Sequence, residues 1–307
     1  MIAWIAETLV ASTLLMLLVL AIRRPIAGAF GPIAAYALWL LPFARMLLPP
    51  LPEGWRPVAE PLMGAAIPEG TVYLMQPVAR IPAVPHGWGL AELPAAAVAM
   101  WAIGGAAFLG WHLIGHARFC ARILADGAPR DVASGHVRVI ETRHAAGPLA
   151  FGLRRRFVAM PADFAERYDA QERSLALAHE LNHHARGDLH ANLLALAVLA
   201  CHWFNPVAWR AYRAFRADQE LACDAGVLRR ASPAVRHAYA SAIVKSAHGG
   251  GVSAAVHLHS IDELKERLTM LSKHRSFSAR RRLMSRFGVA TITALGLALT
   301  ASGTQAA

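Results

Sequence analysis

The sequence predicts a mainly α-helical membrane protein with four transmembrane helices and an α+β domain between the third and the fourth. Hydrophobic residues make up 56% of the 307 residues, and the mean hydropathy of +0.36 exceeds the usual value of soluble globular chains. Charged residues make up 17%, and only five of the 31 lysines and arginines precede residue 117. The first third of the chain therefore has the composition of membrane helices, and the remainder is mostly a basic domain that faces water.

The formal net charge of +11 does not by itself indicate a nucleic-acid-binding protein. The sequence contains no recognisable DNA-binding motif. Basic residues beside membrane helices follow from membrane topology and from attraction to anionic lipid. We therefore expect the lipid bilayer, and no direct nucleic acid, among the partners.

Three cysteines are too few and too widely spaced for a disulfide framework or a cysteine-rich zinc site. Cys120, Cys201 and Cys223 are expected to be small buried side chains in a reducing compartment. Cys223 precedes Asp224, so we expect it to make at most a weak contact with the site described below.

Residues 1–49 are predicted to hold two transmembrane helices, 2–22 and 31–48. The first apolar run is about 30 Å long as a helix, which matches the hydrocarbon core of a bilayer. Arg23 and Arg24 follow this run, whereas a cleaved signal peptide carries its positive charges first. We therefore expect an uncleaved anchor with its N-terminus outside and the arginines inside.

The next segments alternate between membrane and water. Pro42 predicts a kink within the second span. Residues 50–94 are rich in proline and poor in charge, which indicates an extracytoplasmic loop. Residues 95–115 form the third predicted span, and their small side chains offer a close helix-packing face.

Residues 116–286 carry charges throughout and are predicted to form a cytoplasmic domain. An arginine cluster at 280–286 precedes the last apolar run, as expected for a cytoplasmic flank. Residues 287–307 are therefore predicted to form a fourth transmembrane helix and a short tail.

Two short strands are predicted early in this domain, at residues 137–141 and 156–160. The second strand could bind an extended peptide by adding it to the edge of the sheet. A purely structural hairpin is an equally good interpretation of the same residues. Near the end of the domain, residues 261–271 predict a short amphipathic helix.

An H-E-x-x-H motif is the strongest chemical signal in the sequence. Residues four apart share one face of a helix, so His179 and His183 can bind one metal ion. Glu180 lies beside them, where a carboxylate can take a proton from a metal-bound water. A catalytic zinc site usually has three protein ligands, and Glu220 is the predicted third. Asp224, one turn later, is predicted to accept a hydrogen bond from a ligand histidine.

This pattern predicts a zincin-like (gluzincin) metallopeptidase domain with Zn²⁺ as its cofactor. The alternative is a surface helix that happens to carry two histidines. Good helix formers precede the motif and an E-x-x-x-D helix follows it, and both features favour the metal site.

An apolar helix is predicted at residues 190–204, with Asp188 as its cap. The segment is too short to cross a bilayer comfortably. Two placements stay open: the helix packs within the peptidase core, or it dips against the inner leaflet.

Three runs carry a resemblance to a known family: residues 179–188, 202–209 and 220–224. Together with the turn at 147–152 and the arrangement of the spans, they resemble the BlaR/MecR-type integral membrane zinc metallopeptidases, the antirepressors of β-lactam resistance. Members of this type carry a penicillin-binding sensor after the fourth span. This chain is therefore expected to be a short form without that domain.

The resemblance implies a multi-pass protein of the bacterial inner membrane with a cytoplasmic peptidase domain. It implies a zinc endopeptidase that transmits a signal by cleaving a cytoplasmic regulator, such as a winged-helix repressor of the BlaI/MecI type. The resemblance is also compatible with a homodimer.

Two other functions remain open. One is a membrane quality-control protease that resembles HtpX, although the Trp-Phe-Asn-Pro segment at 203–206 argues against it. The other is a zinc-stabilised membrane transducer that cleaves nothing. The presence of Glu180 argues against this second alternative, because a structural zinc site needs no general base.

Overall fold

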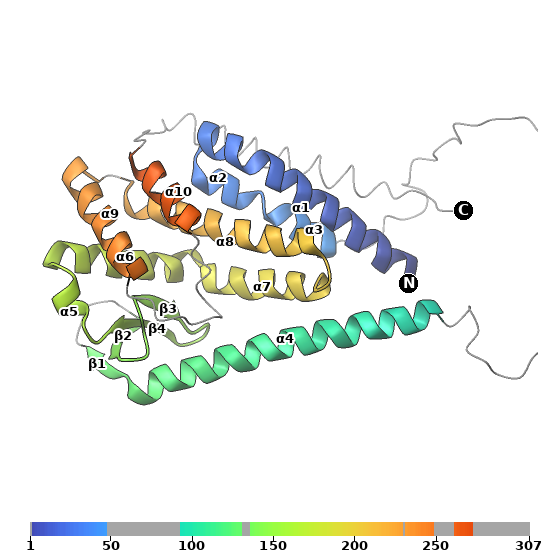
Figure 1. Cartoon of the computed structure of the whole chain (residues 1–307), viewed down its shortest axis with the longest axis horizontal. Helices are drawn as coiled ribbons and strands as arrows, with labels where there is room; N and C mark the ends of the chain where they lie inside the picture. The colour runs from blue at the N-terminus through green and yellow to red at the C-terminus, as the bar shows by residue number, and fades with distance from the viewer. Residues whose placement is uncertain (1, 48–92, 131–135, 230, 249–260, 273–307) are drawn as a thin grey trace, which may run out of the picture.

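Two long helices, α1 (Ile2–Phe30) and α4 (Leu93–Asp126), run along the long dimension of the molecule (Figure 1). This computed structural model describes residues 2–47, 93–130, 136–229, 231–248 and 261–272. Nearly all of the predicted extracytoplasmic loop and the whole of the predicted fourth span lie outside the described residues.

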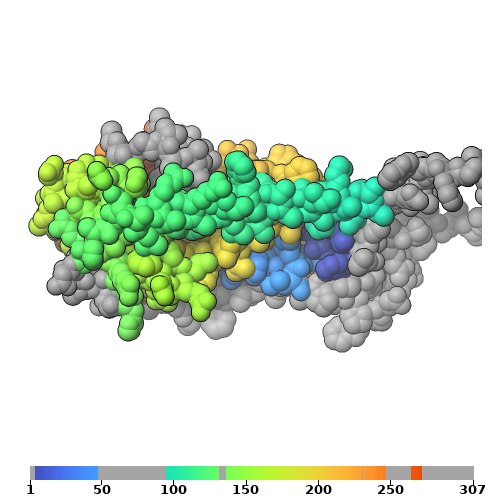
Figure 2. Space-filling view, turned by 90° about the horizontal axis from the view of Figure 1, so that it is seen from below, coloured from blue at the N-terminus to red at the C-terminus, as the bar shows by residue number. Residues whose placement is uncertain are grey.

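The same two helices supply the candidate membrane spans. Within the described part of the chain, Trp4–Phe30 and Ala95–Asp126 are long and apolar enough to cross a membrane. α1 and α4 contain the predicted first and third spans. α4 lies across one face of the molecule (Figure 2), and it exposes large apolar side chains such as Met100 and Trp111. A surface of this kind suits contact with lipid.

The predicted second span is not one continuous helix. It divides into α2 (Pro32–Ala37) and α3 (Leu40–Leu47), which together are shorter than the roughly 20 residues that cross a bilayer. The break includes Trp39, whose indole N–H donates a hydrogen bond of 2.8 Å to Asp218. The predicted kink at Pro42 was therefore misplaced. Pro42 lies in the first turn of α3, where a missing N–H costs little.

The H-E-x-x-H motif lies on α6 (Ala170–Arg186), and Glu220 and Asp224 lie on α8 (Pro206–Val227). α7 (Asp188–Cys201) lies between these two helices in the sequence. α7 and α8 form a hairpin that packs against α4 on one side and α1 on the other (Figure 1). Asn205 begins α8 by accepting a hydrogen bond from the Val207 N–H, with Pro206 in the first turn.

The tip of this hairpin lies against the central residues of the first and third predicted spans. His202 Nε2 is 2.9 Å from the hydroxyl of Ser12 in α1. Trp203 fills the space over Gly104 of α4, where a Cβ atom would stand 2.6 Å from the indole ring. The apolar segment 190–204 therefore leaves the neighbourhood of the sheet and packs between the two long helices.

A four-stranded sheet in the order β1-β2-β4-β3 lies beside α6. Its central strands, β2 (Val137–Thr142) and β4 (Arg156–Pro161), run parallel to each other. The outer strands, β1 (Ala128–Arg130) and β3 (Leu149–Phe151), run antiparallel to their neighbours. The two predicted strands are present, but the hairpin is formed by β3 and β4. Its turn contains Gly152 at φ 87°, a conformation that favours glycine.

Three smaller elements complete the domain: α5 (Phe164–Arg167), α9 (Pro233–His248) and α10 (Ile261–Ser272). The predicted amphipathic helix at 261–271 is confirmed as α10. α9 packs against α6, and α10 packs against α8 and α9. The buried residues of this cluster are Leu228, Tyr239, Ile243 and Leu271.

Candidate metal centre

The two histidines of the motif meet on the buried side of α6. A capping box between Asp169 and Glu172 begins this helix, and Gly187 in the left-handed conformation follows its last turn. His179 Nε2 and His183 Nε2 are 3.1 Å apart. Two nitrogens that bind one zinc ion tetrahedrally at about 2.0–2.1 Å are roughly 3.3 Å apart. The spacing of the rings therefore fits a shared metal ion.

Glu220 approaches the same two nitrogens from α8. Its Oε2 is 3.3 Å from His179 Nε2, and its Oε1 is 3.7 Å from His183 Nε2. The predicted third ligand thus lies with the two histidines, although 37 residues separate Glu220 from His183 in the sequence. A carboxylate and two imidazoles are a donor set that suits zinc.

Cys223 offers a competing donor. Its thiol, His179 and His183 form a group whose ligand atoms lie within 4.8 Å of one another, and such a group also suits zinc. The Cys223 side chain is fully buried, and Asn182 Nδ2 donates to its sulfur at 3.3 Å. Glu220 lines the cavity of the site, whereas Cys223 does not. Glu220 is therefore the donor that faces the cavity.

Asp224 supports His179 through an intermediate side chain. The Tyr239 hydroxyl is 2.6 Å from His179 Nδ1 and donates a hydrogen bond of 2.7 Å to Asp224. The direct approach of Asp224 to His179 Nδ1 is longer, at 3.4 Å. Arg267 of α10 holds the carboxylate with two hydrogen bonds of 2.8 Å. This network places the proton of His179 on Nδ1 and leaves Nε2 free to bind a metal.

Asp188 supports His183 directly, with 2.8 Å between its Oδ2 and His183 Nδ1. The prediction that Asp188 caps the following helix was wrong. Gly187 is the cap residue of α7, and the Asp188 carboxylate turns back to the histidine. Arg186 Nε also donates to Asp188 at 3.1 Å, and the hydroxyl of Tyr36 in α2 lies 3.3 Å away. A residue of α2 thus contacts the side chain that supports His183.

Electrostatics in the site favours a cation. Burial lowers the pKa of His183, but the carboxylates of Glu220 and Asp188 outweigh it, and the net pKa lies well above 6.5. Burial raises the pKa of Glu220, but His183, His179 and Arg267 outweigh it, and the net pKa lies well below 4.5. Ionised carboxylates therefore surround the imidazoles, and a divalent metal can replace their protons.

Glu180 faces the same space from the neighbouring position on α6. Its Oε2 accepts a hydrogen bond of 2.7 Å from the backbone N–H of Ala150 in β3. The catalytic candidate therefore lies between the metal position and the edge strand of the sheet. A cavity of about 120 Å³ connects these groups. The side chains that line it include His179, Glu180, His183, Asp188, Arg216, Glu220, Tyr239, Ile243 and Arg267.

Sequence reasoning missed three of the supporting residues: Asp188, Tyr239 and Arg267. Asp188 follows His183 by five residues, so a helix break after the motif is the signal that could have identified it. Tyr239 and Arg267 come from α9 and α10. No local spacing in the sequence points to either of them.

Comparison with known proteins gives a consistent result. A family model described as BlaR1 peptidase M56 matches residues 95–271. The regulatory protein BlaR1 of Bacillus licheniformis is 30% identical over 112 residues, which cover 36% of this chain and 18% of the relative. The methicillin resistance mecR1 protein of Staphylococcus aureus (strain Mu50) is 26% identical over 146 residues, which cover 46% of this chain and 25% of the relative. The matched part therefore spans a quarter or less of these relatives.

Proposed function

This chain belongs to the BlaR1 peptidase M56 family, and on that basis we propose that it is a membrane-embedded zinc endopeptidase that cleaves a cytoplasmic regulator. The observation that carries the proposal is the convergence of His179, His183, Glu220 and Glu180 on one cavity. An accessible cavity with a carboxylate beside the metal position is what a hydrolytic site needs and a structural zinc site does not.

The proposed zinc ligands are His179, His183 and Glu220. When bound, zinc polarises a substrate carbonyl and lowers the pKa of water at its open position toward about 7. Asp188 and Tyr239 fix the orientation of the two rings, because each contacts the Nδ1 atom that faces away from the metal.

Glu180 is the proposed general base. Its carboxylate takes a proton from the attacking water and then gives that proton to the leaving amine. In the present arrangement, the Ala150 N–H occupies one oxygen of this carboxylate. A group that takes over the Ala150 N–H would therefore free that oxygen to bind water.

We assign the peptide-binding edge to β3. Ala150 directs its N–H away from β4 and into the cavity. An extended substrate can add to this edge as a fifth strand, with a peptide carbonyl accepting the Ala150 N–H. Substrate binding and the release of Glu180 would then occur in one step. The sequence interpretation that assigns peptide addition to the strand at 156–160 is wrong, because this strand, β4, pairs with a neighbour on each side.

We place α1 and α4 across the bacterial inner membrane, with the peptidase domain on the cytoplasmic side. The asymmetry of basic residues supports this orientation. The tip of the α7–α8 hairpin contacts Ser12 and Gly104, near the centres of the predicted first and third spans, so it would lie near the middle of the bilayer. Arg210 and Arg213 of α8 are exposed at shallower depth, and their long side chains can extend toward the headgroups.

The proposed substrate is a winged-helix repressor of the BlaI/MecI type. Two relatives are named a regulatory protein and a methicillin resistance protein, which agrees with a role in regulation rather than in general proteolysis. A homodimer remains a prediction.

The direct test is co-expression of candidate repressors with the wild-type chain and with Glu180→Gln. Glutamine has nearly the same shape as glutamate, so the zinc ligands should stay in place while the base is lost. We expect repressor fragments with the wild type and none with the variant, and equal zinc content in both purified proteins. Cleavage by both proteins would remove Glu180 from the mechanism. Zinc binding without cleavage of any regulator, or of any misfolded membrane protein, would favour a non-proteolytic transducer.

A further inference from the structure

A basic hollow at one end of the sheet lies apart from the metal centre. It has a volume of about 460 Å³ and is lined by His136, Arg138, Arg154, Arg155 and Arg156. No acidic residue lines it, and all five side chains are exposed. Arg154 and Arg155 lie in the β3–β4 turn, which also exposes Leu153, and Arg156 begins β4.

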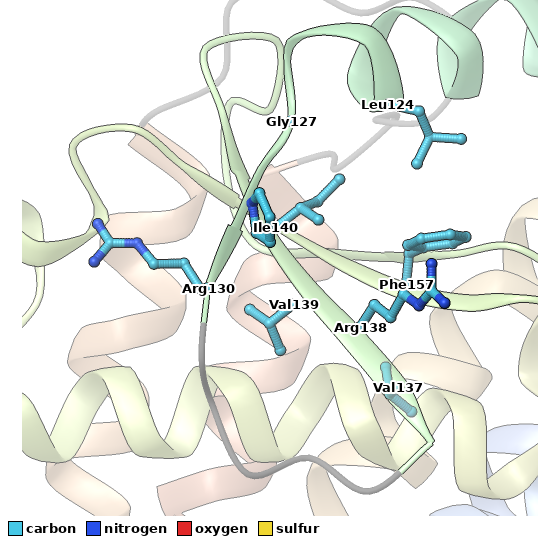
Figure 3. Close-up of a pocket in the computed structure, with 9 residues that line it drawn as sticks. Leu124, Gly127, Arg130, Val137, Arg138, Val139, Ile140 and Phe157 are labelled. Carbon is cyan, nitrogen blue, oxygen red and sulfur yellow. The ribbon is translucent and has the colours of Figure 1, made fainter.

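These arginines differ from others in the same domain. Exposed arginines such as Arg130 and Arg143 form ion pairs with Glu141 and Asp126. Within the described residues, none of the four arginines of the hollow is paired with a carboxylate. Figure 3 shows Arg138 beside Phe157 on the side of β2 that faces α4, whereas Arg130 points the other way. Four like charges that share one hollow repel one another unless an anion binds there.

The position of the hollow relative to the proposed bilayer indicates which anion binds there. His184 Nε2, at the end of α6, donates a hydrogen bond of 2.8 Å to the Phe157 carbonyl, so β4 starts beside the start of α7. α7 has 14 residues and is about 20 Å long. Its far end reaches the centre of the proposed bilayer, whose hydrocarbon half-thickness is about 15 Å. The start of β4 therefore lies about 5 Å outside the hydrocarbon, at the level of the headgroups.

The positions of the arginines along α4 and α1 agree with this estimate of the depth. Measured along α4 from Gly104, which contacts the tip of the hairpin, the first arginine is Arg118, about 20 Å away. Measured along α1 from Ser12, the first exposed arginine is Arg24, about 18 Å away. α1 and α4 thus place exposed arginines at about the depth that α7 gives for the hollow.

We propose that Arg138, Arg154, Arg155 and Arg156 bind the phosphates of anionic phospholipid headgroups, with Leu153 touching the membrane surface. The proposal rests on the membrane placement above and is independent of peptidase activity. Guanidinium groups bind phosphate oxygens through paired hydrogen bonds, and an anionic leaflet supplies many phosphates at this depth. Such contacts would hold the β3–β4 hairpin, and with it the substrate-binding edge, at a fixed orientation to the membrane.

The test compares the full-length chain in detergent with a variant that carries Arg154→Gln, Arg155→Gln and Arg156→Gln. The measurement is the affinity for short-chain phosphatidylglycerol, with short-chain phosphatidylcholine and inorganic phosphate as separate arms. Each basic side chain at an anionic surface changes binding about fivefold, so the variant should bind phosphatidylglycerol about 100-fold more weakly. Binding should also weaken with salt. A control with Arg130→Gln, Arg143→Gln and Arg229→Gln removes the same charge elsewhere and should bind like the wild type.

Zinc content and thermal stability show whether the variants fold. A variant with lysine at the same three positions keeps the charge and should retain most of the lipid affinity. Equal phosphatidylglycerol affinity in the wild type and the glutamine variant would overturn the proposal. Inorganic phosphate binding as tight as lipid binding would also overturn it, by assigning the hollow to a free anion. Loss of regulator cleavage with unchanged lipid affinity would assign the hollow to an acidic protein partner instead.

Discussion

Asp188 gives the sharpest quantitative test of the metal centre. Its carboxylate contacts His183 Nδ1 at 2.8 Å and is almost fully buried. A carboxylate in this position holds the imidazole ring in place and makes its other nitrogen a better metal ligand. Asp188→Asn keeps an oxygen that can accept the His183 proton but removes the negative charge. Asp188→Ala removes both.

The two substitutions should therefore weaken zinc affinity to different extents. Loss of a partner that orients a metal-binding histidine typically weakens metal affinity about 10–100-fold. We expect Asp188→Asn near the lower limit, about 1.4 kcal/mol, because the geometry is kept. We expect Asp188→Ala near the upper limit, about 2.7 kcal/mol, because the ring also loses its anchor.

The assay is competition for zinc between the purified full-length chain and a chromophoric chelator. Asp126→Asn is the matched control, because Asp126 pairs with Arg143 at an exposed position and has no contact with the metal centre. Wild-type zinc affinity in Asp188→Ala would refute the assignment of Asp188 as the support of His183. Equal losses in both Asp188 variants would mean that the charge alone matters.

Three further predictions concern neighbouring residues. Glu220→Ala should lose most bound zinc while Cys223→Ser retains it, and the reverse result in metal analysis would make the thiol the third ligand. Tyr36→Phe removes the hydroxyl that contacts Asp188, so zinc affinity should fall by less than about tenfold; Tyr212→Phe is the control, and equal effects would show a general packing loss. Burial raises the pKa of Glu172, but hydrogen bonds from α9 outweigh it, and the net pKa is below 4.5. The stabilisation from ionised Glu172 is therefore complete above pH 4.5 and is lost as the pH falls toward the pKa that Glu172 has in the folded protein. The melting temperature of Glu172→Gln should therefore fall less than that of the wild type between pH 7 and about pH 3. An equal fall in both proteins would contradict this prediction.

The parts of the site that were predictable are those set by local geometry. His179, Glu180 and His183 occupy one helical turn, and a helix fixes their relation whatever surrounds it. Tyr239 lies 60 residues from the histidine that it contacts, and Arg267 lies 43 residues from Asp224. Their positions depend on how α9 and α10 pack, and the sequence contains no periodic signal for that packing.

The same contrast between local geometry and tertiary packing explains where the predicted fold differs from the structure. The apolar helices α1 and α4 were predictable because a long hydrophobic run has few other structures available. The second predicted span is divided at Leu38 and Trp39, and the Trp39 indole donates to Asp218, a tertiary contact for which the sequence contains no local signal. The position of Asp188 before an apolar helix is typical of a cap, which is why the sequence pattern predicts one there. The nearby His183 proved the stronger partner for its carboxylate.

Three consecutive residues of α8 explain why the membrane helices and the metal centre form one structure. Asp218 pairs with Arg23 of α1 at 2.7 Å, and Gln219 donates to the hydroxyl of Tyr36 at 3.0 Å. Glu220, the next residue, faces the metal position. Because these groups share one helix, a displacement of α1 and α2 relative to α8 must either break buried polar contacts or move Glu220. Breaking them leaves unpaired polar groups in a buried bundle, which is costly. The membrane part is therefore a structural support of the metal centre, and a chain truncated to the peptidase domain should bind zinc less tightly than the full-length protein.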